Sequence, residues 1–142
     1  MTDEKTLFGG KTDVIDLDMI KSFTVIDSKS SEKPIKMQFS EPMFRGKNGL
    51  VLFYAPWCTH CRNFADDYKQ LATVTKGLFP VGAINCQDED RGNNLLADYF
   101  NITVYPSIKI WDQGTFKDYT GGKSMKDLLQ FLCLSNGLCD LV

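Results

Sequence analysis

Residues 50–54, Leu-Val-Leu-Phe-Tyr, constrain the fold more than any other part of the sequence, because every position is apolar. A strand without polar alternation is covered on both faces, so we expect it in the middle of a sheet. The chain then runs from Cys58 to Lys76 without proline or glycine, and Gly77 is expected to end the helix that this stretch predicts. One face of that helix carries Phe64, Tyr68, Leu71 and Thr75. A buried strand that leads at once into an amphipathic helix predicts an α/β protein.

Further elements are predicted on both sides of this unit. Strands are expected at 14–17, 81–85, 107–112 and 115–120, and helices at 93–100 and 124–134. Residues 22–28 and 34–39 are predicted to pair as a hairpin, and residues 46–49 and 113–114 to form turns. The order predicts a mixed central β-sheet flanked by helices, with an extended N-terminal strand and hairpin region.

Length and charge narrow the class of protein. The 142 residues fit a single domain, 1–142, in which 1–47 has the least distinct pattern. There are 16 basic and 18 acidic residues, a net charge of −2, and no basic stripe, which argues against nucleic acid as a partner. The longest apolar run, 50–57, is far shorter than the roughly 18 residues that suggest a membrane span.

The ends of the chain leave the compartment open. The first residues lack the charged-then-apolar pattern of a secretory signal, and the last four are not a retention signal. We therefore expect the protein in the cytoplasm if Met1 is the native start, or in the endoplasmic reticulum lumen if the chain is a domain trimmed of its targeting ends.

Cys58 and Cys61 stand at the start of the predicted helix with the only histidine, His60, between them. A structural zinc site needs four ligands, normally as two closely spaced pairs. The other cysteines, at positions 86, 133 and 139, form no second pair of that kind. Zinc is therefore disfavoured, and the remaining unreactive alternative is a closed structural disulfide or two packed thiols.

The position of Cys58 and Cys61 favours a redox role. The pair lies at the carboxyl end of a buried strand, where open α/β sheets bind their ligands. Unpaired N–H groups and the helix dipole stabilise an anion at a helix N-terminus, so Cys58 is predicted to be the nucleophile. Cys61, one turn further along, is then placed to attack a mixed disulfide on Cys58 and release the substrate.

Residues 50–61, Leu-Val-Leu-Phe-Tyr-Ala-Pro-Trp-Cys-Thr-His-Cys, resemble the active-site strand and helix start of the thioredoxin family. They are most similar to the catalytic domains of protein disulfide isomerases, which carry Trp-Cys-Gly-His-Cys. Residues 104–111 are similar to the family's cis-proline loop, and 118–124 to its hairpin and glycine turn before the last helix. The resemblance covers 48–135 and implies the thioredoxin fold, with Pro106 as the cis residue.

This resemblance implies a thiol-disulfide oxidoreductase that acts on cysteine-containing protein substrates. The loop residues Tyr105 and Pro106 would face the substrate, and Trp57 and His60 would shape the site. No bound cofactor is implied, because electrons pass through partner thiols such as glutathione or a reductase, and we expect a monomer. The alternative is a thioredoxin-like substrate-binding or chaperone module with weak redox turnover.

The sequence departs from the family pattern beneath the cysteine pair. Leu52 stands where the family buries an acid, and Ala83 stands where a lysine pairs with that acid. No orphan charge is buried, but the group that takes the proton from Cys61 is lost, so we expect the pKa of Cys61 to be raised. Lys123 stands where the family has an arginine near the active site, and it is either a weaker substitute or a solvated lysine.

The remaining groups have separate expectations. His60 is expected to stabilise the Cys58 thiolate, which makes the disulfide a better oxidant. Cys86 ends the predicted strand 81–85 and is expected to be a small buried hydrophobe. Cys133 and Cys139 flank Gly137, which can bring them within disulfide range, and the sequence leaves open whether they are bridged.

Overall fold

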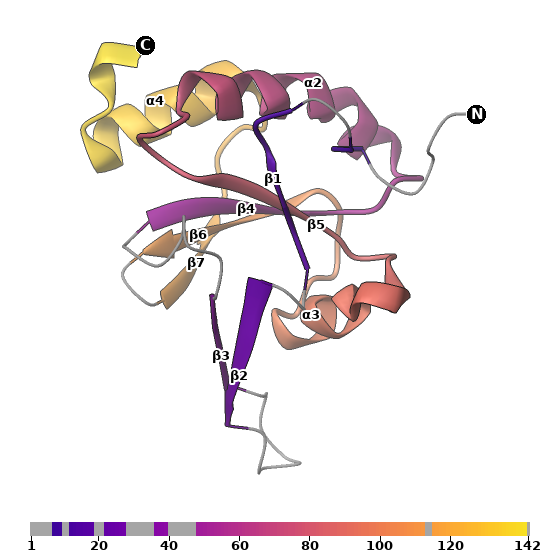
Figure 1. Cartoon of the computed structure of the whole chain (residues 1–142). Helices are drawn as coiled ribbons and strands as arrows, with labels where there is room; N and C mark the ends of the chain where they lie inside the picture. The colour runs from indigo at the N-terminus through magenta and orange to yellow at the C-terminus, as the bar shows by residue number, and fades with distance from the viewer. Residues whose placement is uncertain are drawn as a thin grey trace.

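The computed structural model describes residues 7–9, 12–18, 22–27, 36–39, 48–112 and 115–141. Its main sheet has five strands in the order β1-β5-β4-β6-β7 (Figure 1). They are β1 (Ile15–Leu17), β4 (Asn48–Tyr54), β5 (Val81–Asn85), β6 (Ser107–Asp112) and β7 (Thr115–Tyr119). Strand β5 is parallel to β1 and β4, whereas β6 is antiparallel to β4 and β7. The predicted mixed sheet with a central apolar strand is confirmed.

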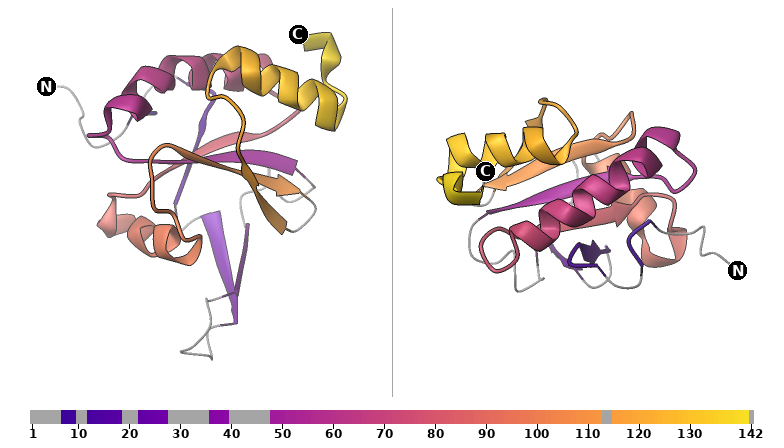
Figure 2. Two further views of the ribbon diagram at one scale, coloured as in Figure 1. Left: turned by 180° about the vertical axis from the view of Figure 1, so that it is seen from behind. Right: turned by 90° about the horizontal axis from the view of Figure 1, so that it is seen from above.

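The side chains of β4 divide between two hydrophobic cores. Leu50, Leu52 and Tyr54 lie in the core beneath the helices α2 (Thr59–Val74) and α4 (Met125–Asn136). Val51 and Phe53 lie in the opposite core, which includes residues of helix α3 (Asn93–Tyr99). Figure 2 shows α2 and α4 over one face of the sheet and α3 over the other. Because successive side chains of a strand point to opposite faces, a strand that is apolar throughout requires both layers.

Both long helices begin at a side-chain cap. Cys58 is the N-cap of α2, and Ser124 is the N-cap of α4, where its hydroxyl accepts from the N–H of Asp127 at 3.1 Å. Helix α2 ends at Val74, slightly before the predicted Lys76, and the turn that follows contains Gly77 with φ +81°. That left-handed conformation is the reason a glycine is needed there.

The N-terminal hairpin is confirmed as β2 (Phe23–Asp27) paired antiparallel with β3 (Lys36–Phe39). It forms a separate sheet of two strands, which Figure 1 shows on the same side of the main sheet as α3. The turn predicted at 46–49 is wrong for its second half, because Asn48 and Gly49 already pair with β6. Residues 46–47 and the turn predicted at 113–114 lie outside the described residues.

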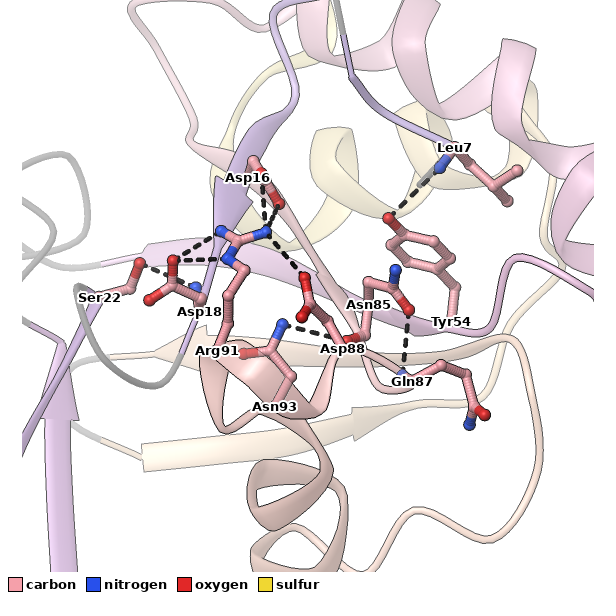
Figure 3. A network of polar contacts seen from close by, with 10 residues as sticks. All are labelled: Leu7, Asp16, Asp18, Ser22, Tyr54, Asn85, Gln87, Asp88, Arg91 and Asn93. Atoms are coloured by element: carbon pink, nitrogen blue, oxygen red, sulfur yellow. Dashed lines mark hydrogen bonds and ion pairs between the residues drawn. The ribbon is translucent and has the colours of Figure 1, made fainter. Parts of the chain in front are cut away.

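An ion-pair network joins the N-terminal segment to the loop that follows β5 (Figure 3). Arg91 donates from Nε and Nη2 to the carboxylate of Asp18 at 2.8 and 2.6 Å, and from Nη1 to Asp16 at 3.0 Å. Both Arg91 nitrogens donate to the same Asp18 oxygen, and the Asp18 side chain is only 1% exposed whereas that of Arg91 is 27% exposed, so the carboxylate end of the pair is shielded from water. The sequence pattern did not reveal this contact between segments more than 70 residues apart.

Candidate active site

The cysteine pair lies where β4 ends and α2 begins, as the sequence predicts. The turn between β4 and α2 is closed by a hydrogen bond from the Cys58 N–H to the carbonyl of Ala55 at 3.1 Å. As the helix cap, the Cys58 Sγ accepts from the backbone N–H of Cys61 at 3.4 Å. Both thiols are free, with Cys58 8% exposed and Cys61 fully buried. Cys58 thus accepts an N–H at its sulfur and keeps a small exposed fraction, whereas Cys61 has none.

The loop before β6 closes over Cys58. The peptide bond between Tyr105 and Pro106 is cis, which confirms the assignment of Pro106. Cys58 Sγ donates to the carbonyl oxygen of Tyr105 at 3.6 Å. The Trp57 ring, which is 64% exposed, meets the Tyr105 ring edge-on with centroids 6.0 Å apart. The loop therefore brings a backbone carbonyl to Cys58 Sγ, and its Tyr105 ring packs against the ring of Trp57, the residue before Cys58.

A groove of about 460 Å³ runs from this loop along α2. It is lined by His60, Asn63, Phe64, Asp67, Val104, Tyr105, Pro106 and Lys123. The helix residues recur at intervals of three and four, which puts them on one face of α2. Lys123 lines the groove from the segment that leads into α4, and Asp67 accepts from the backbone N–H of Met125 at 3.1 Å. Four residues expected from the sequence, His60, Tyr105, Pro106 and Lys123, therefore share one cavity.

Burial determines the protonation of the second cysteine. The pKa of the Cys61 thiol is raised from 9.0 to about 12, chiefly by removal from water and in smaller part by the adjacent Cys58. Leu52 and Ala83 lie beneath α2 as direct partners in the β4–β5 register, and they are 0% and 1% exposed. No carboxylate occupies the strand positions where the family buries one. The expected raised pKa of Cys61 is confirmed.

Two further features concern metals and membranes. Within the described ranges, no three or more His, Cys, Asp or Glu side chains gather as potential ligands of a metal ion. Over the same part of the chain, none of the helices combines the length and the apolar character needed to cross a membrane.

The other three cysteines differ in state. Cys133, near the end of α4, is bonded to Cys139 in a disulfide, which answers the question that the sequence left open. The helix ends at Gly137 with φ +71°, and this reversal brings the two sulfurs together. Cys86 is a free thiol, 2% exposed, as expected for a small buried hydrophobe. The Cys86 thiol donates to the carbonyl oxygen of Ile84 at 3.8 Å.

Comparison with known proteins places this site in a family. A family model described as Thioredoxin matches residues 32–133. The chain belongs to the thioredoxin family. This thioredoxin-family chain is 34% identical to protein disulfide-isomerase 1 of Dictyostelium discoideum over 90 residues, with 61% of the chain and 24% of the relative covered. It is 35% identical to protein disulfide-isomerase A4 of Homo sapiens over 80 residues, with 56% and 12% covered.

The chain thus spans about a quarter or less of the length of these two relatives. Among solved structures, the first thioredoxin domain of mouse protein disulfide-isomerase A4 is 30% identical with a TM-score of 0.51, and the match covers 64% of this chain and 66% of that one. The J-Trx1 fragment of ERdj5 matches with a TM-score of 0.61 at 24% identity, covering 86% and 51%. This second likeness shows the fold alone.

Proposed function

We propose that this chain is a thiol-disulfide oxidoreductase of the protein disulfide isomerase type, acting on cysteines of other proteins. The observation that carries the proposal is Cys58, a helix-capping thiol that faces the carbonyl of Tyr105, with Cys61 one turn behind it. Similarity to proteins named protein disulfide-isomerase supports the same reaction class. Cys58 is the nucleophile in this proposal, and Cys61 is the resolving thiol.

The exchange proceeds in two balanced steps. The Cys58 thiolate attacks one sulfur of a substrate disulfide, so that a mixed disulfide forms and the other substrate sulfur leaves with the electron pair and takes up a proton. Cys61 then loses its proton and attacks Cys58 Sγ, which forms the Cys58–Cys61 disulfide and releases the second substrate sulfur as a thiol. Two electrons pass from the enzyme dithiol to the substrate. The reverse sequence oxidises a substrate dithiol.

The groove residues have defined parts in this proposal. The backbone at Tyr105 and Pro106 pairs with an extended substrate segment, and the exposed Trp57 ring covers its apolar side chains. His60 stabilises the Cys58 thiolate by charge or a hydrogen bond. The Lys123 ammonium lies across the groove and favours the anionic form of a reacting sulfur.

The raised pKa of Cys61 distinguishes the two steps. Attack by Cys58 requires no group beneath α2, whereas release requires a proton to leave a buried thiol whose pKa is about 12. We expect attack to be normal and release to be slow at neutral pH, so mixed disulfides accumulate.

The raised pKa of Cys61 also favours a second candidate function. In this second candidate, Leu52 and Ala83 lie beneath the cysteine pair, and the chain holds substrates in the groove as a binding or chaperone module with weak redox turnover. Reduction of insulin by dithiothreitol, measured beside Cys58→Ser, separates the two. Catalysis that is lost in Cys58→Ser supports the oxidoreductase, whereas no catalysis together with unchanged binding of unfolded protein supports the module.

The remaining expectations concern partners and organisation. We propose that glutathione or a reductase restores the dithiol, that the chain is a monomer, and that residues 1–142 form one domain. The variant Cys61→Ser cannot resolve a mixed disulfide, so the proteins trapped on Cys58 identify the redox partners. Sedimentation of the reduced protein tests whether it is a monomer.

A further inference from the structure

Asp67 lines the groove, but the exchange reaction gives it no part. This half-buried residue lies on α2, the helix that also carries Cys61. Its carboxylate Oδ2 accepts from the backbone N–H of Met125, the first residue of α4, at 3.1 Å. The helix that carries the resolving thiol is therefore bonded to the beginning of the helix that follows Lys123.

The start of α4 explains why a carboxylate is placed there. The N–H groups in the first turn of a helix have no partner within the helix, and the helix dipole favours a negative charge beside them. The N-cap Ser124 accepts from the N–H of Asp127, the third residue of α4, at 3.1 Å, and donates to its carboxylate at 2.9 Å. Asp67 reaches across from α2 to the N–H of the first residue, Met125.

The segment 120–124, which carries Lys123, packs closely on the elements around it. Tyr119 Oη donates to the carbonyl of Gly122 at 2.6 Å. A Cβ on Gly122 would overlap the carboxylate of Asp127, so this position accepts no side chain. The chain is thus held on the N-terminal side of Lys123 by β7 and on its C-terminal side by the bond from α2.

We infer that Asp67 is a positioning residue for Lys123: its hydrogen bond to the first residue of α4 holds the ammonium at the groove. The inference rests on the proposed function, because that function assigns the charge of Lys123 to a reacting sulfur. Lys123 itself is exposed and lines the groove from the segment before α4. Without an acceptor at position 67, the segment keeps its bond at Gly122 but loses the one at Met125, so the ammonium spends less time at the groove.

Two small disulfides of opposite charge measure the ammonium at the groove. 5,5′-Dithiobis(2-nitrobenzoate) carries two carboxylates, whereas cystamine carries two ammonium groups, and both oxidise protein thiols. The ratio of their rates with the reduced protein, anionic over cationic, reports charge, because loosened packing alone changes both rates alike. Lys123→Met should lower this ratio about twofold to tenfold, the range for a partly screened charge that acts oppositely on the two probes.

Asp67→Asn and Asp67→Leu are the matched variants for the hydrogen bond. Both remove the carboxylate charge and have a similar size, but only asparagine keeps an oxygen that accepts from the Met125 N–H. We expect the ratio in Asp67→Leu to be about twofold to fivefold lower than in Asp67→Asn. Because Asp67 acts through Lys123, the two variants should have equal ratios when each is combined with Lys123→Met.

Hydrogen exchange of the Met125 amide gives a readout that needs no activity. This amide should exchange faster in Asp67→Leu than in the natural protein and be protected again in Asp67→Asn. Equal ratios for Asp67→Asn and Asp67→Leu, a difference that persists in Lys123→Met, or unchanged exchange in Asp67→Leu would overturn the positioning role. Failure of the proposed function is seen separately, as absence of insulin reduction by the natural protein, and it leaves both readouts measurable.

Discussion

The slow release of substrate by Cys61 can be tested by restoring an acid at Leu52. Cys61 on α2 and Leu52 on β4 lie in the same hydrophobic core, and Leu52 pairs with Ala83 on the neighbouring strand. A carboxylate at position 52 would enter the apolar region that raises the pKa of Cys61 and could take its proton. Leu52→Glu is therefore the perturbation, and Leu52→Gln is the matched control with the same shape and no proton acceptor.

The size of the effect follows from the pKa of Cys61. A rise from 9.0 to about 12 lowers the thiolate fraction at pH 7 by about 1000-fold. A more basic thiolate is intrinsically more nucleophilic, by about 15- to 30-fold for this shift, so release is slowed by about 30- to 60-fold. We expect Leu52→Glu to recover about tenfold or more of this at pH 7, and Leu52→Gln to recover none.

The pH dependence has a defined sign. Because the pKa of Cys61 is raised and the thiolate is the attacking form, release by the natural protein should rise about tenfold per pH unit between pH 6 and 9, without a plateau. Leu52→Glu should flatten this profile. A buried acid without a counter-charge is also expected to destabilise the fold by several kcal/mol, and Leu52→Glu/Ala83→Lys should restore part of that loss.

Stopped-flow fluorescence of Trp57 can follow formation and resolution of the mixed disulfide, since this residue precedes Cys58 and its ring packs against Tyr105, whose carbonyl accepts from Cys58 Sγ. Acid-quenched samples with blocked thiols measure the mixed disulfide independently. Equal release rates for the natural protein and Leu52→Glu from pH 6 to 9 would refute the reasoning. Equal acceleration by Leu52→Gln would show that polarity, and not proton transfer, limits the step.

Three further predictions concern the cysteine pair, the reduction potential and the buried ion pair. In the reduced protein, iodoacetamide should modify Cys58 much faster than Cys61 at pH 7, because Cys58 caps the helix and is the less buried of the two thiols. Peptide mapping that finds Cys61 modified first would reverse the roles. His60→Pro should lower the reduction potential from near the ~−180 mV of protein disulfide isomerase toward the ~−270 mV of thioredoxin. A glutathione titration that shows no downward shift of the potential would remove His60 from the mechanism. Arg91→Met should reduce the free energy of unfolding, measured in urea, by about 3–5 kcal/mol, because it removes the guanidinium that pairs with the buried Asp18 carboxylate. A loss below about 1 kcal/mol, as measured for exposed ion pairs, would contradict that account.

Local patterns in the sequence were sufficient for the central unit of the fold. The unbroken apolar run at 50–54 required cover on both faces, and the helix after Cys58 supplied one of the layers. Strands β5 and β6 have the predicted bounds, because turn residues and burial mark both ends. The reactive pair could be located for the same reason, since a helix N-terminus after a buried strand is a local signal. Resemblance to a family added the cis bond before Pro106, which no periodicity indicates.

The tertiary structure alone decided which distant groups meet. Arg91 binds Asp18 across 73 positions, and the Tyr105 carbonyl meets Cys58 Sγ across 47. Such pairs cannot be read from spacing, because contacts between elements depend on strand order and on the twist that brings loop ends together. The bridge between Cys133 and Cys139 also depended on how the chain turns after Gly137. The raised pKa of Cys61 depends on both the sequence and the tertiary structure. The sequence shows the apolar residues Leu52 and Ala83, but only the β4–β5 register and the packing of α2 remove the Cys61 thiol from water.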